Sequence, residues 1–167
     1  MSFPSASKSI CLFLLSFSII TKIDAQIQSD SLAFGDMKRV EHGIRGKLYA
    51  LPAGTQNLPD FDTMKPMGTV YTTKIDVPTR DWSTGFPGAT NMREWFGVLY
   101  EATFTVNKAG HYEFRCLSDD GSKLYIDDSL VVNNDGQHGP SDKSGGIDID
   151  NKKHHFRLEY FHSRINF

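Results

Sequence analysis

Two adjacent aspartates, Asp119 and Asp120, are the residues of this chain whose type and spacing best suit chemistry. They open the stretch 119–150, which holds eight aspartates and only two lysines. Neighbouring carboxylates repel each other, and the repulsion grows where the dielectric constant is low. Such a cluster is either a solvated rim or a site for a hard cation. Ca²⁺, which takes about six to eight oxygen ligands, is the ion that suits it.

An ordinary turn is the alternative interpretation of the same residues. Asp tolerates turn geometry and Gly supplies positive φ angles, so Asp119-Asp120-Gly121 between two strands is also a common turn sequence. The segment Asn133-Asn134-Asp135-Gly136 carries the same ambiguity between a loop and a set of ligands. For Asp127 and Asp128 a tight hairpin turn is the better interpretation. Residue types alone leave the cation site and the turn both open.

The elements that must position these aspartates are strands. Apolar and polar residues alternate over 98–106 and again over 112–116, with a turn at 107–110, which predicts a hairpin whose second strand runs directly into Asp119. Further strands are expected over 44–51, 68–77, 123–126 and 130–132, with a Gly-, Pro-, Ser- and Asp-rich loop over 133–146 and a last hairpin around 151–153. Many short strands at this spacing predict an all-β fold, an antiparallel β-sandwich or barrel.

The first 25 residues have the order of a secretory signal peptide. Lys8 precedes an apolar run over 10–20, which a polar segment follows up to Ala25. The run is too short to span a bilayer, which needs about 20 residues, and a buried N-terminal helix is the less favoured alternative. We therefore expect a signal peptide over 1–25, a polar lead-in over 26–42 and one domain over 43–167. The product would be secreted or displayed at the cell surface, without a membrane span.

Composition narrows the function further. Removing Lys8, Lys22 and Asp24 with the signal peptide leaves sixteen basic and nineteen acidic side chains, a net charge of −3 that disfavours nucleic acid as a partner. Cys116 is the one cysteine outside that peptide, so no intrachain disulfide is expected. Adjacent aspartates in one turn do not flank a sugar from two sides at about 5–10 Å, as glycoside hydrolysis requires, so we expect no catalysis.

Six sequence motifs occur in an order typical of a known family. They are Gly43-Ile44-Arg45-Gly46-Lys47-Leu48-Tyr49, Gly85-Phe86-Pro87-Gly88, Glu94-Trp95-Phe96-Gly97, Gly110-His111-Tyr112-Glu113-Phe114, Ser118-Asp119-Asp120-Gly121-Ser122-Lys123-Leu124-Tyr125-Ile126-Asp127 and Asn134-Asp135-Gly136. Together they resemble the fourteen-kilodalton protective-antigen domain, the β-sandwich module named after anthrax toxin protective antigen. The similarity runs from about Gly43 to Phe161, and the piece from Ser118 to Asp127 is the most specific.

The resemblance implies a site. In sugar-binding members, two consecutive aspartates joined by a cis peptide hold a calcium ion, which grips sugar hydroxyls. Asp119 and Asp120 match those positions, as ligands of the metal and as part of the carbohydrate site. Further ligands come from a downstream loop, here 133–139, which makes Asn134 and Asp135 candidate metal ligands. Asn134 is also a candidate for lining the sugar site. Its place in the same loop makes His138 a further candidate, with a solvated loop histidine as the more common alternative.

The expected protein is therefore a secreted, calcium-dependent carbohydrate-binding module whose partner is a cell-surface or extracellular polysaccharide. A structural or protein-interaction β-sandwich without metal is the alternative. The family usually continues past the strand near Tyr160-Phe161 into at least one more strand, whereas this chain stops at Phe167. Either the sequence is thus a fragment, or the sandwich lacks its closing strand, which is the expectation adopted for the fold.

Overall fold

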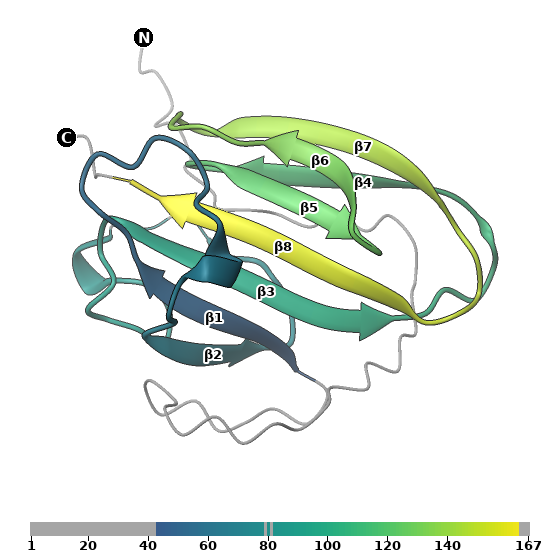
Figure 1. The fold of residues 1–167 in the computed structure, drawn as a ribbon, viewed down its shortest axis with the longest axis horizontal. Coiled ribbons are helices and arrows are strands. Elements are labelled where there is room, and N and C mark those ends of the chain that lie inside the picture. The colour runs from purple at the N-terminus through teal and green to yellow at the C-terminus, as the bar shows by residue number, and fades with distance from the viewer. Residues whose placement is uncertain (1–42, 79, 81, 164–167) are drawn as a thin grey trace, which may run out of the picture.

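The computed structural model describes residues 43–78, 80 and 82–163, and it is built almost entirely of strands (Figure 1). The strands are β1 (Ile44–Ala50), β2 (Gly68–Thr72), β3 (Phe96–Phe104), β4 (Gly110–Ser118), β5 (Ser122–Ile126), β6 (Ser129–Asn134), β7 (Ser141–Ile149) and β8 (His154–His162). Two 3-10 helices, η1 (Phe61–Thr63) and η2 (Trp82–Thr84), lie in the connections on either side of β2. The signal peptide and lead-in expected over 1–42 lie outside the described residues.

Two antiparallel sheets form the layers of a sandwich, which confirms the predicted fold class. The larger sheet has the order β2-β1-β3-β8-β5-β6, and the smaller one pairs β4 with β7 (Figure 1). Every pairing is antiparallel. Within the described residues, no helix is long and apolar enough to span a bilayer.

The alternating pattern read from the sequence places one face of each central strand in the core. On β3, Phe96, Val98 and Tyr100 are buried in the main cluster, while Leu99 between them packs into a second cluster on the opposite face. Cys116 on β4 is completely buried and forms no disulfide. Burying apolar side chains on both sides of the larger sheet gives this small fold its core.

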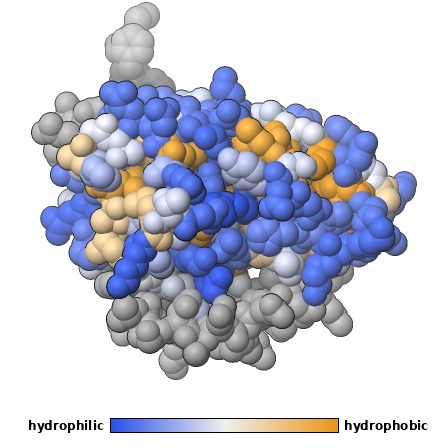
Figure 2. Space-filling model, in the orientation of Figure 1, coloured by the Kyte–Doolittle hydropathy of each residue, from blue (hydrophilic) through white to orange (hydrophobic). Residues whose placement is uncertain are grey.

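Loops complete both layers. The main cluster includes six side chains from the connection between β2 and β3, which therefore contributes to the layer facing the inner side of the larger sheet: Ile75, Val77, Trp82, Phe86, Ala89 and Met92. The connection between β1 and β2 packs on the outer side, where the ring of Phe61 lies 4.7 Å from that of Tyr49. Apolar patches are scattered among hydrophilic side chains on the face shown in Figure 2.

Two predicted hairpins are wrong. β3 and β4 follow each other in the chain, but β3 pairs with β1 and β8 whereas β4 pairs with β7. The last two strands, β7 and β8, are likewise neighbours in sequence that belong to different sheets. Local alternation and turn residues predict where a strand begins and ends, but the pairing partner is chosen by burial in the complete sandwich. The predicted β5–β6 hairpin is confirmed.

The loop predicted over 133–146 is also wrong, since β6 reaches Asn134 and β7 already begins at Ser141. β7 was not recognised because most of its side chains are exposed and polar. Its glycine Gly145 has a packing reason: a Cβ there would lie 1.8 Å from the carbonyl oxygen of Val131 in β6. Glycine thus lets the backbones of β6 and β7 approach closely.

The β5–β6 turn is closed by two residues with positive φ, Asp127 (48°) and Asp128 (65°), as in the hairpin turn predicted for them. Nδ1 of His154 lies 2.5 Å from the Asp127 carboxylate, and this hydrogen bond raises the pKa of His154 above its ordinary value. Burial raises the pKa of Asp127, but hydrogen bonds from His154 and from the backbone N–H of His155 outweigh it, so that this pKa is lowered.

Replacing Gly145 with Ala is expected to lower the free energy of unfolding by about 2 kcal/mol or more, because the new methyl group would overlap the Val131 carbonyl. Urea unfolding of the purified variant measures this loss. The matched control is Gly139→Ala, where a Cβ would meet nothing within 4 Å; its stability should change by less than about 0.5 kcal/mol. Equal stability of the two variants would contradict the close approach of β6 and β7.

The Asp127–His154 pair predicts a pH-dependent stability. His154 has a raised pKa, so its contribution is full below its unfolded value near 6.5 and fades as pH rises through the folded pKa. Asp127 has a lowered pKa, so its contribution is present above its unfolded value near 3.8 and fades as pH falls through the folded pKa. We expect His154→Gln to cost about 0.5–1 kcal/mol more at pH 5.5 than at pH 9, since Asp127 is half exposed.

Urea unfolding at the two pH values measures that difference. His155→Gln is the matched control, because it keeps the backbone N–H that bonds Asp127 and removes only a weaker charge interaction with that carboxylate, so its pH dependence should be smaller. A loss that is the same at both pH values for His154→Gln would show that the pair contributes only packing.

Candidate functional site

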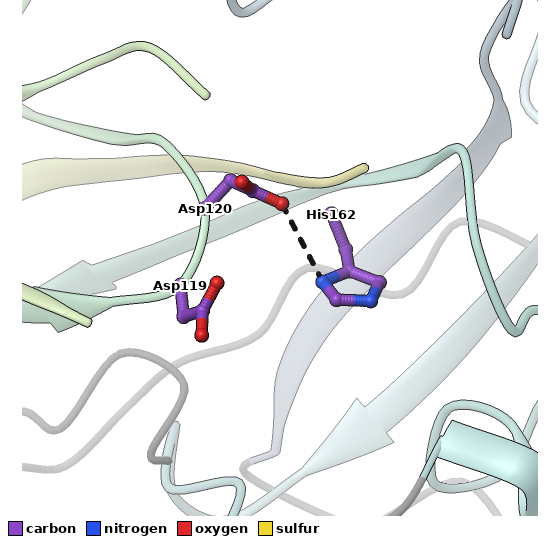
Figure 3. A group of neighbouring side chains, drawn as sticks. All are labelled: Asp119, Asp120 and His162. Carbon is purple, nitrogen blue, oxygen red and sulfur yellow. Dashed lines mark ion pairs between the residues drawn. The ribbon is translucent and has the colours of Figure 1, made fainter. Parts of the chain in front are cut away.

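The loop joining β4 to β5 brings Asp119 and Asp120 next to His162, the last residue of β8 (Figure 3). The peptide bond between the two aspartates is cis, as the resemblance implied. One ligand atom from each of the three side chains lies within 4.8 Å of the others. We refer to Asp119, Asp120 and His162 as the Asp-His group. The group therefore brings together residues from the β4–β5 loop and from the end of β8 at one edge of the sandwich.

Asp120 is held by the backbone around it and is only 4% exposed. Its Oδ1 accepts a hydrogen bond from the backbone N–H of His138 (3.1 Å), and its Oδ2 accepts one from the N–H of Ser163 (2.7 Å). Oδ2 also lies 3.6 Å from Nδ1 of His162, the ion pair drawn in Figure 3. Hydrogen bonds to a carboxylate are roughly twice as strong as neutral ones. This side chain therefore joins the loop after β6 to the segment after β8.

Asp119 and Gly121 are fixed through their backbone. The carbonyl oxygen of Asp119 accepts a hydrogen bond from the Tyr160 hydroxyl (2.6 Å), and that of Gly121 accepts one from the N–H of Phe161 (3.0 Å). A Cβ at Gly121 would lie 2.5 Å from the Phe161 ring and 2.8 Å from the nitrogen of Gly136. The φ of Gly121 is not positive. Close packing of two loops, rather than turn geometry, therefore requires this glycine.

His162 belongs to the group although the sequence pattern did not predict it. Its side chain is 5% exposed, and its ring packs against that of Trp82 at 4.6 Å between centroids. The pairing of β5 with β8 brings it to the site, because Ser122 lies opposite Tyr160 in the register. Because the pairing is antiparallel, the same register continued to two residues before Ser122 and two residues after Tyr160 sets Asp120 beside His162. That signal can be read only once the pairing is known.

Asn134, predicted to contact metal and sugar, is buried in a polar cluster under the loop. Its Nδ2 donates to the hydroxyl of Ser118 and to the carbonyl of Ser141 (both 3.0 Å), while its Oδ1 accepts from the Ser141 hydroxyl (2.9 Å). The Ser118 hydroxyl is also 2.8 Å from that of Ser122. These bonds tie together the ends of β4 and β6 and the starts of β5 and β7. They give Asn134 a structural task beneath the aspartate loop.

Asp135, the other predicted ligand in the downstream loop, lies outside the Asp-His group. Its Oδ2 accepts from Nζ of Lys123 (2.7 Å), and its Oδ1 accepts from the backbone N–H of Leu58 (2.8 Å). Burial lowers the pKa of Lys123, but the hydrogen bond to Asp135 outweighs it, so that the pKa is raised. Asp135 thus attaches the connection between β1 and β2 to the β6–β7 loop.

His138, predicted to line the sugar site, supports the group through its backbone. Its N–H donates to Asp120, while its ring nitrogens lie 2.7 Å from the carbonyl of Gly139 and 3.0 Å from that of Asn134. Of the predicted residues, the structure brings Asp119 and Asp120 together and sets His138 beside them. Asn134 and Asp135 are engaged with other partners.

The Asp-His group has the donors of a divalent cation site. Two carboxylates supply negative charge and oxygen ligands, which Ca²⁺ accepts. Calcium takes about six to eight oxygens, so most of its positions would be left to water or to the hydroxyls of a ligand. The imidazole of His162 adds a nitrogen donor, which first-row transition metals accept more readily than calcium does. The aspartate pair therefore fits a divalent ion with open coordination positions.

Comparison with known proteins identifies one family. Residues 42–166 match the family model described as PA14 domain, which covers most of the chain. No curated protein sequence matches the chain.

Similar solved structures share the fold. A PA14 sugar-binding domain from an RTX adhesin is 18% identical, with a TM-score of 0.54 over 71% of this chain and 81% of that one. An anti-sigma factor domain-containing protein is 21% identical, with a TM-score of 0.57 over 72% of this chain and 38% of that one. A β-glucosidase from Kluyveromyces marxianus is 14% identical, with a TM-score of 0.51, and this chain spans only 14% of it.

The hydrogen bonds of Asp120 predict that the two aspartates differ in their effect on stability. Asp120→Ala should lower the free energy of unfolding by about 2–3 kcal/mol, because two backbone N–H groups lose a charged acceptor in a buried place. Asp119→Ala should cost less than half as much, since the Tyr160 hydroxyl bonds its backbone carbonyl, which the substitution keeps. Chemical denaturation in the presence of a chelator measures both. Equal losses would contradict the structural role of Asp120.

Proposed function

Because the chain belongs to the PA14 domain family, we propose that it is a carbohydrate-binding module whose sugar site is centred on Asp119 and Asp120. The observation that carries this proposal is the convergence of the two carboxylates at a loop edge of the sandwich. The similarity to a sugar-binding PA14 domain from an adhesin supports it at the level of the fold. The proposed partner is a cell-surface or extracellular polysaccharide, reached by an exported protein.

Calcium is the proposed cofactor. When bound, the ion would supply positive charge and open positions for two neighbouring sugar hydroxyls. Asp119 and Asp120 would hold it, and their own charges would no longer repel each other. The backbone N–H groups of His138 and Ser163 fix the orientation of Asp120, so that little rearrangement is needed on binding. Selectivity among sugars would come from the loop over 135–140 next to the aspartates.

The proposed module binds carbohydrate but does not cleave it. The two carboxylates sit on consecutive residues of one loop and approach a ligand from the same side. Hydrolysis of a glycosidic bond needs carboxylates on both sides of the bond, about 5–10 Å apart. The similarity to a β-glucosidase covers 14% of that enzyme and does not transfer its activity.

A structural or protein-interaction module is the second candidate function, and one observation favours it. Asp120 already accepts two backbone hydrogen bonds, so it has a task in the fold that needs no ion. On this interpretation the aspartates only shape the edge of the sandwich. A chelator would then change neither stability nor partner binding.

A glycan array with the purified protein tests the proposal. We expect binding to a restricted set of glycans at millimolar calcium and its loss in excess chelator. Asp119→Ala should abolish binding while keeping most of the stability. Affinity for single sugars is expected to be weak, so multivalent display is needed to detect it.

The control is Asp148→Asn. Asp148 is exposed and pairs with His111 near the far end of β4, so its loss removes one carboxylate without touching the site. Binding that survives both the chelator and Asp119→Ala would reject the metal-dependent site and leave the second candidate.

A further inference from the structure

We propose that His162 is a third protein ligand of the metal site, and that the site therefore binds Zn²⁺ more tightly than Ca²⁺. This inference rests on the metal site of the proposed function but not on the sugar. It adds a nitrogen donor to the two aspartates, which zinc accepts readily and which calcium, the cofactor of the proposed function, does not require. Three observations carry it: the spacing of the donor atoms, their chemistry, and the way the side chains are held.

The spacing suits one small ion. Nδ1 of His162 lies 3.6 Å from Oδ2 of Asp120, and a ligand atom of Asp119 completes a set within 4.8 Å. Neighbouring ligands of a tetrahedral zinc with metal–ligand distances near 2.0–2.1 Å lie about 3.4 Å apart. The Asp120–His162 separation is already close to that edge. The Asp119 carboxylate, which is only partly buried, needs a small shift to complete the third corner.

The donor chemistry favours zinc over calcium. Imidazole nitrogen suits zinc and other first-row metals, whereas calcium takes an all-oxygen shell. The two residues expected to supply further oxygens, Asn134 and Asp135, both bond other partners with their side chains. Three protein ligands with at least one open position are typical of a zinc site that accepts a water or another oxygen ligand.

The imidazole is held in place before any ion arrives. Its ring packs against Trp82 at 4.6 Å and against Phe96 at 5.4 Å, and the side chain is 5% exposed. Two backbone N–H groups orient the Asp120 carboxylate. Residues that bond metal ligands from behind commonly have this role. A donor set fixed in this way loses little conformational entropy on binding.

Isothermal titration of the chelator-stripped protein with ZnCl₂ and with CaCl₂ tests the inference. We expect one zinc per chain, bound at least about tenfold more tightly than calcium. His162→Gln should weaken zinc binding by about tenfold or more, the range seen even for outer-shell partners of metal ligands, and change calcium binding by less than about threefold. The control His111→Gln removes an exposed histidine at the opposite end of β4 and should change neither affinity.

Because His162 is buried, its substitution could also disturb the fold, so a measurement on the unchanged protein is needed. The imidazole nitrogen signals of His162, followed by NMR during zinc titration, should shift to metal-bound values, while those of His111 should not. Zinc affinity equal to that of calcium, or an imidazole signal of His162 unaffected by zinc, would overturn the inference.

The two proposals fail separately. A glycan array without any metal-dependent binding rejects the carbohydrate function, while the zinc titration and the His162 signal still decide the identity of the ion. Calcium-dependent glycan binding together with a His162 signal that zinc leaves unchanged would overturn only the inference made for His162.

Discussion

The buried carboxylate of Asp120 is the constraint on which this end of the molecule depends. It accepts backbone hydrogen bonds from the loop after β6 and from the segment after β8, and among the described strands β6 and β8 are not paired with each other. A buried carboxylate is costly unless it is satisfied, and here the backbone satisfies it. The same bonds hold it 3.6 Å from His162, so the interaction that stabilises the edge also prepares the site.

A second polar layer lies directly beneath. Ser118, Ser122 and Asn134 are almost completely buried and bond one another or Ser141, which links the strand ends of both sheets. Buried networks of this kind stabilise only when their members are satisfied, and they then specify one arrangement of the chain. This network supports the loop that carries Asp119 and Asp120. A binding site needs such support because its ligand-binding side chains must be held in fixed positions.

Much of the fold could be predicted from the sequence, because strand formation depends on local alternation. The two faces of β3 followed from this alternation, and the β5–β6 turn followed from the turn residues Asp127 and Asp128. The sheet partners of β4 and β7 did not, since alternation is the same whichever strand lies alongside. β7 itself was missed because an exposed strand carries the polar and glycine residues of a loop. Gly145 in this strand is required by the close approach of the β6 backbone, which the sequence pattern does not reveal.

At the site, sequence by itself determined the aspartate pair, because both carboxylates lie on consecutive residues and need no distant partner to be recognised. Their cis link was anticipated from family resemblance. Only the tertiary structure decided which other residues stand beside them. It turned Asn134 toward buried serines and Asp135 toward Lys123, and it brought His162 across from β8. The physical reason is that the pairing of β5 with β8 brings together Asp120 and His162, which lie 42 positions apart, a distance along the chain over which no local pattern carries information.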